Sequence, residues 1–150
     1  MLNLGSTYLI VKNMELSIAF YKALLDMPVS AQNENRWAQF NIGEVCLALF
    51  NPEYDEEKIR SGGNLEKHYN QAYLDYKANT AIRYGNNFVL NFWVEDLNAE
   101  YERVKKLNIS EVSEILFINI AAPYYCFMLE DPDGNVIEIT GKYRTEPAWS

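Results

Sequence analysis

One carboxylate, Glu138, lies in the middle of an otherwise apolar segment, "NVIEIT" (135–140), whose pattern predicts a strand. A lone carboxylate in apolar surroundings costs free energy unless it is paired, protonated or bound to a metal ion. Three roles are therefore open for Glu138. It pairs with a protein cation or a hydroxyl such as a tyrosine, it anchors a polar or cationic group of a ligand, or it acts as a general base.

Other side chains with chemical potential are few. His68 is the only histidine, and we expect it to be a surface or packing residue of a helix. Cys46 and Cys126 fall in apolar runs without a CxxC spacing, which predicts buried free thiols in a reducing compartment. Because there is one histidine, no serine or cysteine has the partners of a catalytic triad.

The segments that would position Glu138 belong to a plan that occurs twice. "LIVKNMELSIAFYKALL" (9–25) and "FWVEDLNAEYERVKKLN" (92–108) share a strand end, a valine, and Asn13 or Asp96 as the N-cap of an amphipathic helix. Three strand-like runs follow each helix. We therefore predict an α+β fold of two βαβββ modules, with the helices on the outer face of the sheets.

The chain length indicates a single domain of 150 residues, with module one at 1–50, a linker at 51–86 and module two at 87–150. The polar stretch at 51–64, which contains two adjacent glycines, predicts a loop. The stretch at 65–78 predicts a helix with a stripe of tyrosines. This linker helix either covers a sheet or acts as a lid or dimer arm.

Three motifs resemble those of a known superfamily. "VKNMELSIAFYKALL", "RWAQFNIGEVCLAL" and above all "EDPDGNVIEI" are similar to segments of the glyoxalase / bleomycin-resistance / extradiol-dioxygenase (vicinal oxygen chelate) proteins. The resemblance covers nearly the whole chain except residues 51–86. It implies that the two modules form a pseudo-symmetric cleft between curved sheets, and that the protein is a homodimer.

In metal-dependent members of that superfamily, a glutamate at the position of Glu138 is a metal ligand. The resemblance and the internal repeat place the companion positions at Ser6, Leu47 and Val89, and leucine and valine cannot bind a metal. A catalytic site of this kind needs about three protein ligands and an open position. We therefore predict no metal and no other cofactor, and Glu138 is the only candidate for a catalytic residue.

Alternation along the strands then predicts the walls of the implied cleft. Val136 and Thr140 share the face of Glu138, whereas Ile137 and Ile139 turn toward the helices. The strand phase of Trp37 and Tyr125 stays open, and core packing is the alternative role for the tryptophans. The predicted ligand-binding residues are Tyr8, Trp37, Leu47, Asn91, Trp93, Tyr125, Glu138 and Thr140.

The net charge and the hydropathy of the chain limit the classes of partner that we expect it to bind. The formal net charge of −8 argues against nucleic acid, because phosphates would be repelled. No apolar run reaches the length of a membrane span, and the first residues lack the pattern of a signal peptide. We expect a cytoplasmic protein whose partner is a small molecule, without nucleic acid or membrane.

The function predicted first is a homodimeric binding protein of the glyoxalase/bleomycin-resistance type without a catalytic metal. It would sequester an antibiotic or metabolite that is partly aromatic, and a basic drug would suit an acidic chain. The alternative is a glyoxalase-like lyase, isomerase or dioxygenase of a small metabolite, with Glu138 as base or ligand. A third possibility is a scaffold that binds another protein through the linker helix.

Overall fold

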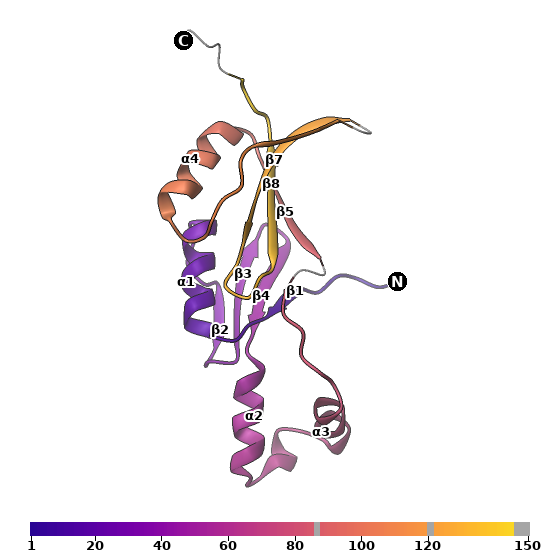
Figure 1. Ribbon diagram of the computed structural model, residues 1–150. Coiled ribbons are helices and arrows are strands. Elements are labelled where there is room, and N and C mark those ends of the chain that lie inside the picture. The colour runs from indigo at the N-terminus through magenta and orange to yellow at the C-terminus, as the bar shows by residue number, and fades with distance from the viewer. Residues whose placement is uncertain (86–87, 120–121, 146–150) are drawn as a thin grey trace. The chain divides into compact units, whose positions relative to one another are not determined.

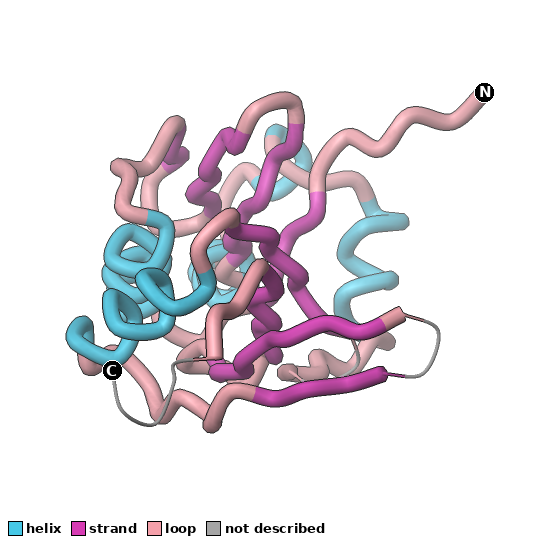
Figure 2. Tube along the Cα trace, turned by 90° about the horizontal axis from the view of Figure 1, so that it is seen from above, coloured by secondary structure: helices cyan, strands magenta, loops and turns pink. Residues whose placement is uncertain are grey.

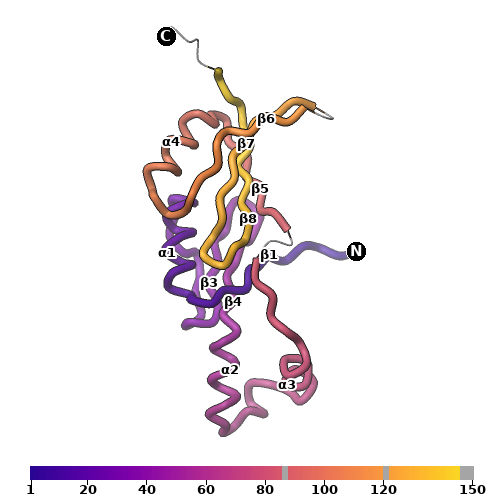
Figure 3. The backbone as a smooth tube through the Cα atoms, viewed as in Figure 1, coloured from indigo at the N-terminus to yellow at the C-terminus, as the bar shows by residue number. Residues whose placement is uncertain are grey.

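The computed structural model describes residues 1–85, 88–119 and 122–145 (Figure 1). Contacts divide the chain into two compact units. The N-terminal unit comprises Met1–Lys22 and Met27–Tyr84, and the C-terminal unit comprises Ala23–Asp26 and the residues from Gly85 on. Within the described residues, each unit contains one four-stranded sheet, whose strands can be followed in Figure 3.

The N-terminal sheet has the strand order β1-β4-β3-β2, and β1 runs parallel to β4. Its helix begins after Asn13, whose side-chain oxygen accepts a hydrogen bond from the Leu16 amide at 3.0 Å. The ring of Tyr21 on this helix packs against Phe40 of the sheet at 6.4 Å. The elements are β1 (Thr7–Ile10), α1 (Met14–Leu25), β2 (Ala31–Asn33), β3 (Trp37–Ile42) and β4 (Val45–Phe50).

The C-terminal sheet repeats this topology as β5-β8-β7-β6, with β5 parallel to β8. Its helix starts at the predicted cap, Asp96, which accepts from the Ala99 amide at 3.1 Å, and Tyr101 packs against Phe127 of the sheet. The elements are β5 (Val89–Val94), α4 (Leu97–Leu107), β6 (Leu116–Asn119), β7 (Pro123–Glu130) and β8 (Val136–Gly141). The predicted α+β fold of βαβββ modules is confirmed, and Figure 2 distinguishes the helices from the strands by colour.

The segment after β4 differs from the prediction of a loop, because it begins with a helix, α2 (Pro52–Ser61). The side chain of Asn51 caps this helix by accepting from the Glu53 amide at 3.1 Å. Proline at the first position, acidic residues in the first turn and basic residues in the last turn all favour a helix. These end signals outweigh the polar composition on which the prediction of a loop was based.

The helix predicted over 65–78 is shorter than expected. A single 3₁₀ turn, η1 (Leu65–Lys67), precedes the helix α3 (Gln71–Ala78). The break occurs because Asn70 adopts an extended conformation and its side chain accepts a hydrogen bond from the Tyr73 amide at 2.9 Å. An asparagine N-cap of this kind starts a new helix rather than continuing an old one.

Two smaller sequence expectations can be compared with the structure. Both cysteines are free, as predicted, with Cys126 buried and Cys46 half-buried. Within the part of the chain that the structure describes, no helix is both long and apolar enough to cross a bilayer. A cytoplasmic location stays a prediction.

Candidate functional site

Three aromatic side chains gather on one face of the N-terminal sheet. The strand register pairs Trp37 with Phe50 and Tyr8 with Ala48, so all of these residues point to the side opposite the one that packs on α1. The Tyr8 ring lies 5.2 Å from Trp37 and 6.0 Å from Phe50, in both cases edge to face. The rings therefore form a continuous aromatic surface.

Helices α2 and α3 and the segment after them surround this surface and enclose a cavity of about 400 Å³. That volume is suited to a small organic molecule. We name it the aromatic pocket. Its lining residues are Tyr8, Ile10, Arg36, Trp37, Phe50, Pro52, Glu56, Tyr73, Tyr76, Lys77, Thr80, Ala81, Ile82 and Arg83.

Charged groups lie among the apolar walls of the aromatic pocket. The Arg36 guanidinium lies over the Phe50 ring, 4.9 Å from its centroid. The Lys77 ammonium lies 3.7 Å from a carboxylate oxygen of Glu56 and donates to the Pro52 carbonyl at 3.4 Å. The aromatic pocket thus combines stacking surfaces with a small number of polar groups that can orient a ligand.

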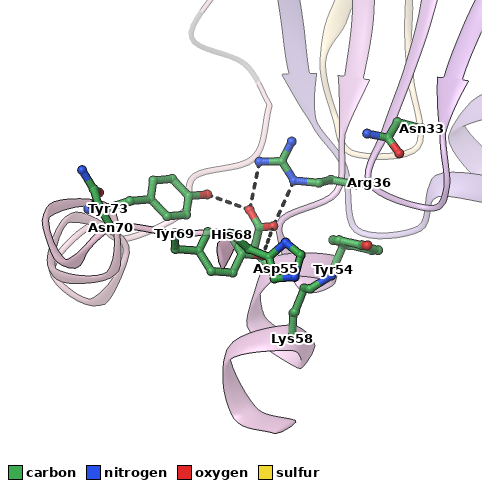
Figure 4. Close-up of a pocket in the computed structure, with 9 residues that line it drawn as sticks. All are labelled: Asn33, Arg36, Tyr54, Asp55, Lys58, His68, Tyr69, Asn70 and Tyr73. Carbon is green, nitrogen blue, oxygen red and sulfur yellow. Dashed lines mark hydrogen bonds and ion pairs between the residues drawn. The ribbon is translucent and has the colours of Figure 1, made fainter. Parts of the chain in front are cut away.

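Asp55 of α2 holds two residues of this lining, Arg36 and Tyr73, through hydrogen bonds that Figure 4 shows as dashed lines. Its side chain is fully buried, and both oxygens accept hydrogen bonds from the Arg36 guanidinium, at 2.9 and 3.2 Å. The hydroxyl of Tyr69 donates to Oδ1 at 2.7 Å, and that of Tyr73 donates to Oδ2 at 2.6 Å. We name Arg36, Asp55, Tyr69 and Tyr73 the Asp55 cluster. It joins β3, α2 and α3 through one carboxylate.

Electrostatics in the Asp55 cluster favour the ionised carboxylate. Burial raises the pKa of Asp55, but the hydrogen bonds from Arg36, Tyr73 and Tyr69 outweigh burial, and the pKa is lowered overall. Burial, followed by the hydrogen bond to the carboxylate, raises the pKa of Tyr69 and of Tyr73. Both tyrosines are therefore hydroxyl donors at neutral pH.

A second, more polar cavity of about 610 Å³ is lined by all four residues of the Asp55 cluster (Figure 4). Arg36 and Tyr73 line both this cavity and the aromatic pocket, so the cluster is a shared wall. His68 also lines the polar cavity. Its other lining residues are Asn33, Tyr54, Asp55, Lys58, Tyr69 and Asn70.

Glu138, in the C-terminal unit, is paired with protein groups. The Asn91 amide donates to its Oε1 at 2.6 Å and also to the Thr140 hydroxyl oxygen at 2.9 Å. The Thr140 hydroxyl in turn donates to Glu138 Oε1 at 3.3 Å. Burial raises the pKa of the Cys126 thiol, and the charge of Glu138 raises it further. The partners of this carboxylate include an amide, a threonine hydroxyl and the Cys126 thiol, rather than a tyrosine.

The strand register corrects the alignment of the two modules from which Leu47 was matched to Glu138. Tyr8 pairs with Ala48, and the corresponding Asn91 pairs with Glu138, so Ala48 is the counterpart of Glu138. Because a slip of one residue reverses the face, Leu47 points to the α1 side and is 4% exposed. The predicted match of Leu47 to Glu138, which placed Leu47 on the face of the sheet that lines the implied cleft, is wrong.

The donor set does not fit the metal site that the family resemblance implies. The corrected companion positions hold Ser6, Ala48 and Val89, of which serine alone carries a side-chain donor. Within the described ranges, no three His, Cys, Asp or Glu side chains lie close enough together to bind a metal ion.

The remaining predicted residues fall into three groups. Tyr8 and Trp37 come together in the aromatic pocket. Asn91 and Trp93 pair with Glu138 and Thr140 and share one face of the C-terminal sheet. Tyr125 pairs with Gly141, which places it on the opposite face, where its ring contacts Phe117 and Tyr143.

Sequence reasoning allowed the linker helix to cover a sheet or to act as a lid, but it did not connect the linker with Tyr8 and Trp37, and it missed the whole Asp55 cluster. A signal existed in the tyrosine stripe at 65–78, because Tyr69 and Tyr73 lie one turn apart and carry hydroxyls that need partners when buried. Asp55 gave no such signal, since it lies in a stretch rich in acidic residues.

Comparison with known protein families and structures identifies proteins that are similar to this chain. The sequence profile of the family described as "Glyoxalase/Bleomycin resistance protein/Dioxygenase superfamily" matches residues 3–139. No curated protein matches the chain in sequence.

Several solved structures share the fold. A glyoxalase/bleomycin resistance protein/dioxygenase from Nocardioides is 16% identical, with a TM-score of 0.67, and the match covers 99% of this chain and 88% of that one. A lactoylglutathione lyase from Agrobacterium tumefaciens is 18% identical, with a TM-score of 0.63 and coverage of 93% and 92%. A glyoxalase-related enzyme from Fulvimarina pelagi is 14% identical, with a TM-score of 0.64 and coverage of 95% and 89%. At such identities the similarity shows the fold alone.

Proposed function

Because the chain belongs to the glyoxalase/bleomycin resistance protein/dioxygenase superfamily, we propose that it binds a small, flat molecule in the aromatic pocket without a catalytic metal. One observation carries the proposal. Tyr8, Trp37 and Phe50 share a sheet face, and the linker helices enclose the space beside them. The Tyr8 side chain is 51% exposed, so the cavity of about 400 Å³ beside it is accessible to a ligand from solvent.

The expected affinity of a minimal ligand is modest. At roughly 0.4 kcal/mol per non-hydrogen atom, a compound of about 13 such atoms gains about 5 kcal/mol, which corresponds to a Kd on the order of 0.1 mM. Aromatic contacts each add roughly 0.5–1.5 kcal/mol beyond simple burial. A natural ligand with more atoms and matched polar groups would bind more tightly.

We propose that the protein uses the aromatic pocket to sequester an antibiotic or a metabolite. A sequestering protein lowers the free concentration of its ligand and returns it unchanged. The pairing of Glu138 with Asn91 and Thr140 supports this role, because the carboxylate has hydrogen-bond partners within its own sheet.

The enzymatic alternative places lyase, isomerase or dioxygenase chemistry at Glu138. The solved structures that share the fold include a lactoylglutathione lyase, and that activity is a property of that protein. Elemental analysis of the purified protein discriminates between the two functions. A stoichiometric transition metal with metal-dependent turnover would favour the enzyme.

A titration with 2-naphthamide, a flat neutral probe, tests binding in the aromatic pocket. We expect calorimetry to give a Kd on the order of 0.1 mM that treatment with EDTA leaves unchanged. Trp37→Leu should weaken binding at least fivefold, since it removes one stacking ring. Trp93→Leu is the matched control and should leave the Kd unchanged, because Trp93 belongs to the other sheet. Equal losses in both variants would contradict the proposal.

The homodimer implied by the superfamily is part of the same proposal. Sedimentation velocity over a range of protein concentrations checks it directly. We expect a species of twice the 17.4 kDa chain mass, and a single monomeric species at all concentrations would refute this part.

A further inference from the structure

The charges around the aromatic pocket indicate which class of ligand it takes. We propose that the ligand is a planar aromatic carboxylate, stacked on the aromatic surface and bound through its carboxylate by Arg83. This inference rests on the proposed function, and it reverses the expectation that an acidic chain binds a basic drug.

Arg36 contributes little net charge to the pocket. Both oxygens of the buried Asp55 side chain accept hydrogen bonds from its guanidinium. A bidentate pair of this kind neutralises the positive charge and fixes the plane of the guanidinium. Arg36 therefore acts as part of the wall, where its guanidinium lies over the Phe50 ring.

Lys77 and Glu56 form a second neutral pair. Their charged groups are 3.7 Å apart, and the Lys77 side chain is 16% exposed. Glu56 is the only acidic residue among those that line the aromatic pocket within the described part of the chain. A cationic ligand at Glu56 would share that carboxylate with Lys77, and the repulsion between the two positive charges would weaken its binding.

Arg83 is the charge that remains. It lines the aromatic pocket, and among the described residues it has no ion pair. Its guanidinium offers paired N–H donors whose geometry matches a carboxylate. Because the charges of Arg36 and Lys77 are balanced, the exposed Arg83 side chain is the cation of the lining that can pair with the carboxylate of a ligand.

The overall charge of −8 does not overturn this local preference. Charges separated by more than about 8 Å are largely screened at physiological ionic strength. A ligand carboxylate in contact with Arg83 lies well within about 8 Å of the guanidinium. Most acidic side chains of the chain do not line the pocket, so their repulsion of the ligand is weaker.

Three probes of nearly equal size test the inference: 2-naphthoate, 2-naphthamide and 2-naphthylmethylammonium. At 0.15 M salt we expect the wild-type protein to bind the anion roughly two- to fivefold more tightly than the neutral amide, as for an exposed ion pair. The cation should bind more weakly than the amide. Arg83→Gln should remove the preference for naphthoate while leaving the Kd of naphthamide unchanged.

Arg60→Gln provides the matched control, because it removes the same charge from α2 at a residue that does not line the aromatic pocket. It should retain the preference for the anion. The inference is overturned if the cation binds as tightly as the anion, if Arg83→Gln keeps the preference, or if Arg60→Gln loses it. Binding of naphthamide alone supports the proposed function without this inference, and failure of all three probes to bind contradicts both.

Discussion

The Tyr73 hydroxyl donates a 2.6 Å hydrogen bond to Oδ2 of Asp55, and the same tyrosine lines the aromatic pocket. Asp55 in turn pairs with Arg36, which is the residue directly before Trp37. The linker is thus joined through one buried carboxylate to the strand that carries the pocket's tryptophan. Formation of the pocket and integrity of the Asp55 cluster are therefore expected to be linked.

Asp55→Asn tests the contribution of this carboxylate to stability. The substitution keeps the shape but removes the charge that Arg36 faces, and it leaves fewer acceptors for the two tyrosines. Breaking a fully buried ion pair costs roughly 3–5 kcal/mol, but the Arg36 side chain is 34% exposed. We therefore expect a loss of about 2 kcal/mol in the free energy of unfolding, measured by urea denaturation.

Asp75→Asn is the control for that variant. Asp75 is also a linker carboxylate, but its side chain accepts a hydrogen bond at an exposed position, from Gln71 at 2.9 Å. We expect a change within about 0.5 kcal/mol, as is usual for surface substitutions. Equal losses of unfolding free energy in the two variants would show that the Asp55 carboxylate contributes no more to stability than an exposed one.

Tyr69→Phe removes a single hydrogen bond to the charged Asp55. Such a bond contributes roughly 1.5–3 kcal/mol when buried, and because the ring is only half-buried we expect a loss of about 1 kcal/mol. Tyr76→Phe on the same linker should cost less than about 0.5 kcal/mol, since Tyr76 is 65% exposed. Thermal unfolding of both variants provides the comparison, and a larger loss in Tyr76→Phe would be inconsistent with the structure.

The pKa of Asp55 is lowered in the folded protein, which fixes the sign of a pH effect. Its contribution to stability is fully present above the unfolded-state pKa of about 3.9 and is lost as the pH falls from there toward the folded-state pKa. The stability difference between wild type and Asp55→Asn should therefore be constant between about pH 5 and 7 and shrink below about pH 4. Urea unfolding at several pH values measures it, and a difference that grows on acidification would contradict this sign.

Much of the fold follows from the sequence because its signals are local. The caps Asn13 and Asp96 and the period of the helices after them specify two equivalent modules, and the alternation around Glu138 correctly assigns Ile137 and Ile139 to the buried face. The match of Leu47 to Glu138 failed for a different reason. It was counted through turns of unequal length, since β3 and β4 are joined by Gly43 and Glu44, whereas Asp131–Asn135 separate β7 from β8. Strand pairing fixes the register, and pairing is a long-range property.

The candidate site was less predictable than the fold. Tyr8 and Trp37 could be proposed from strand alternation, but the residues that enclose them come from a linker in which α2 was expected to be a loop. The partners of Asp55 lie between 14 and 19 residues away along the chain. No periodicity within one element connects them, so their meeting depends on how the linker packs.

Glu138→Gln tests whether this carboxylate is needed as a charge. Glutamine keeps an oxygen that can accept from Asn91 and Thr140, so we expect the free energy of unfolding to change by less than about 1 kcal/mol. The Kd of 2-naphthamide should be the same as in the wild type, because Glu138 belongs to the C-terminal sheet. Calorimetry measures the Kd, and urea denaturation measures the free energy of unfolding. A large loss of ligand binding would indicate that the site lies in the C-terminal unit.

The indole N–H resonances of the tryptophans test the proposed site most directly. In a two-dimensional ¹H–¹⁵N spectrum they can be assigned with Trp37→Leu and Trp93→Leu, and 2-naphthamide can then be titrated into metal-free wild-type protein. We expect the Trp37 resonance to shift in a saturable manner while that of Trp93 stays in place. A saturable shift at Trp93 without one at Trp37 would contradict binding in the aromatic pocket.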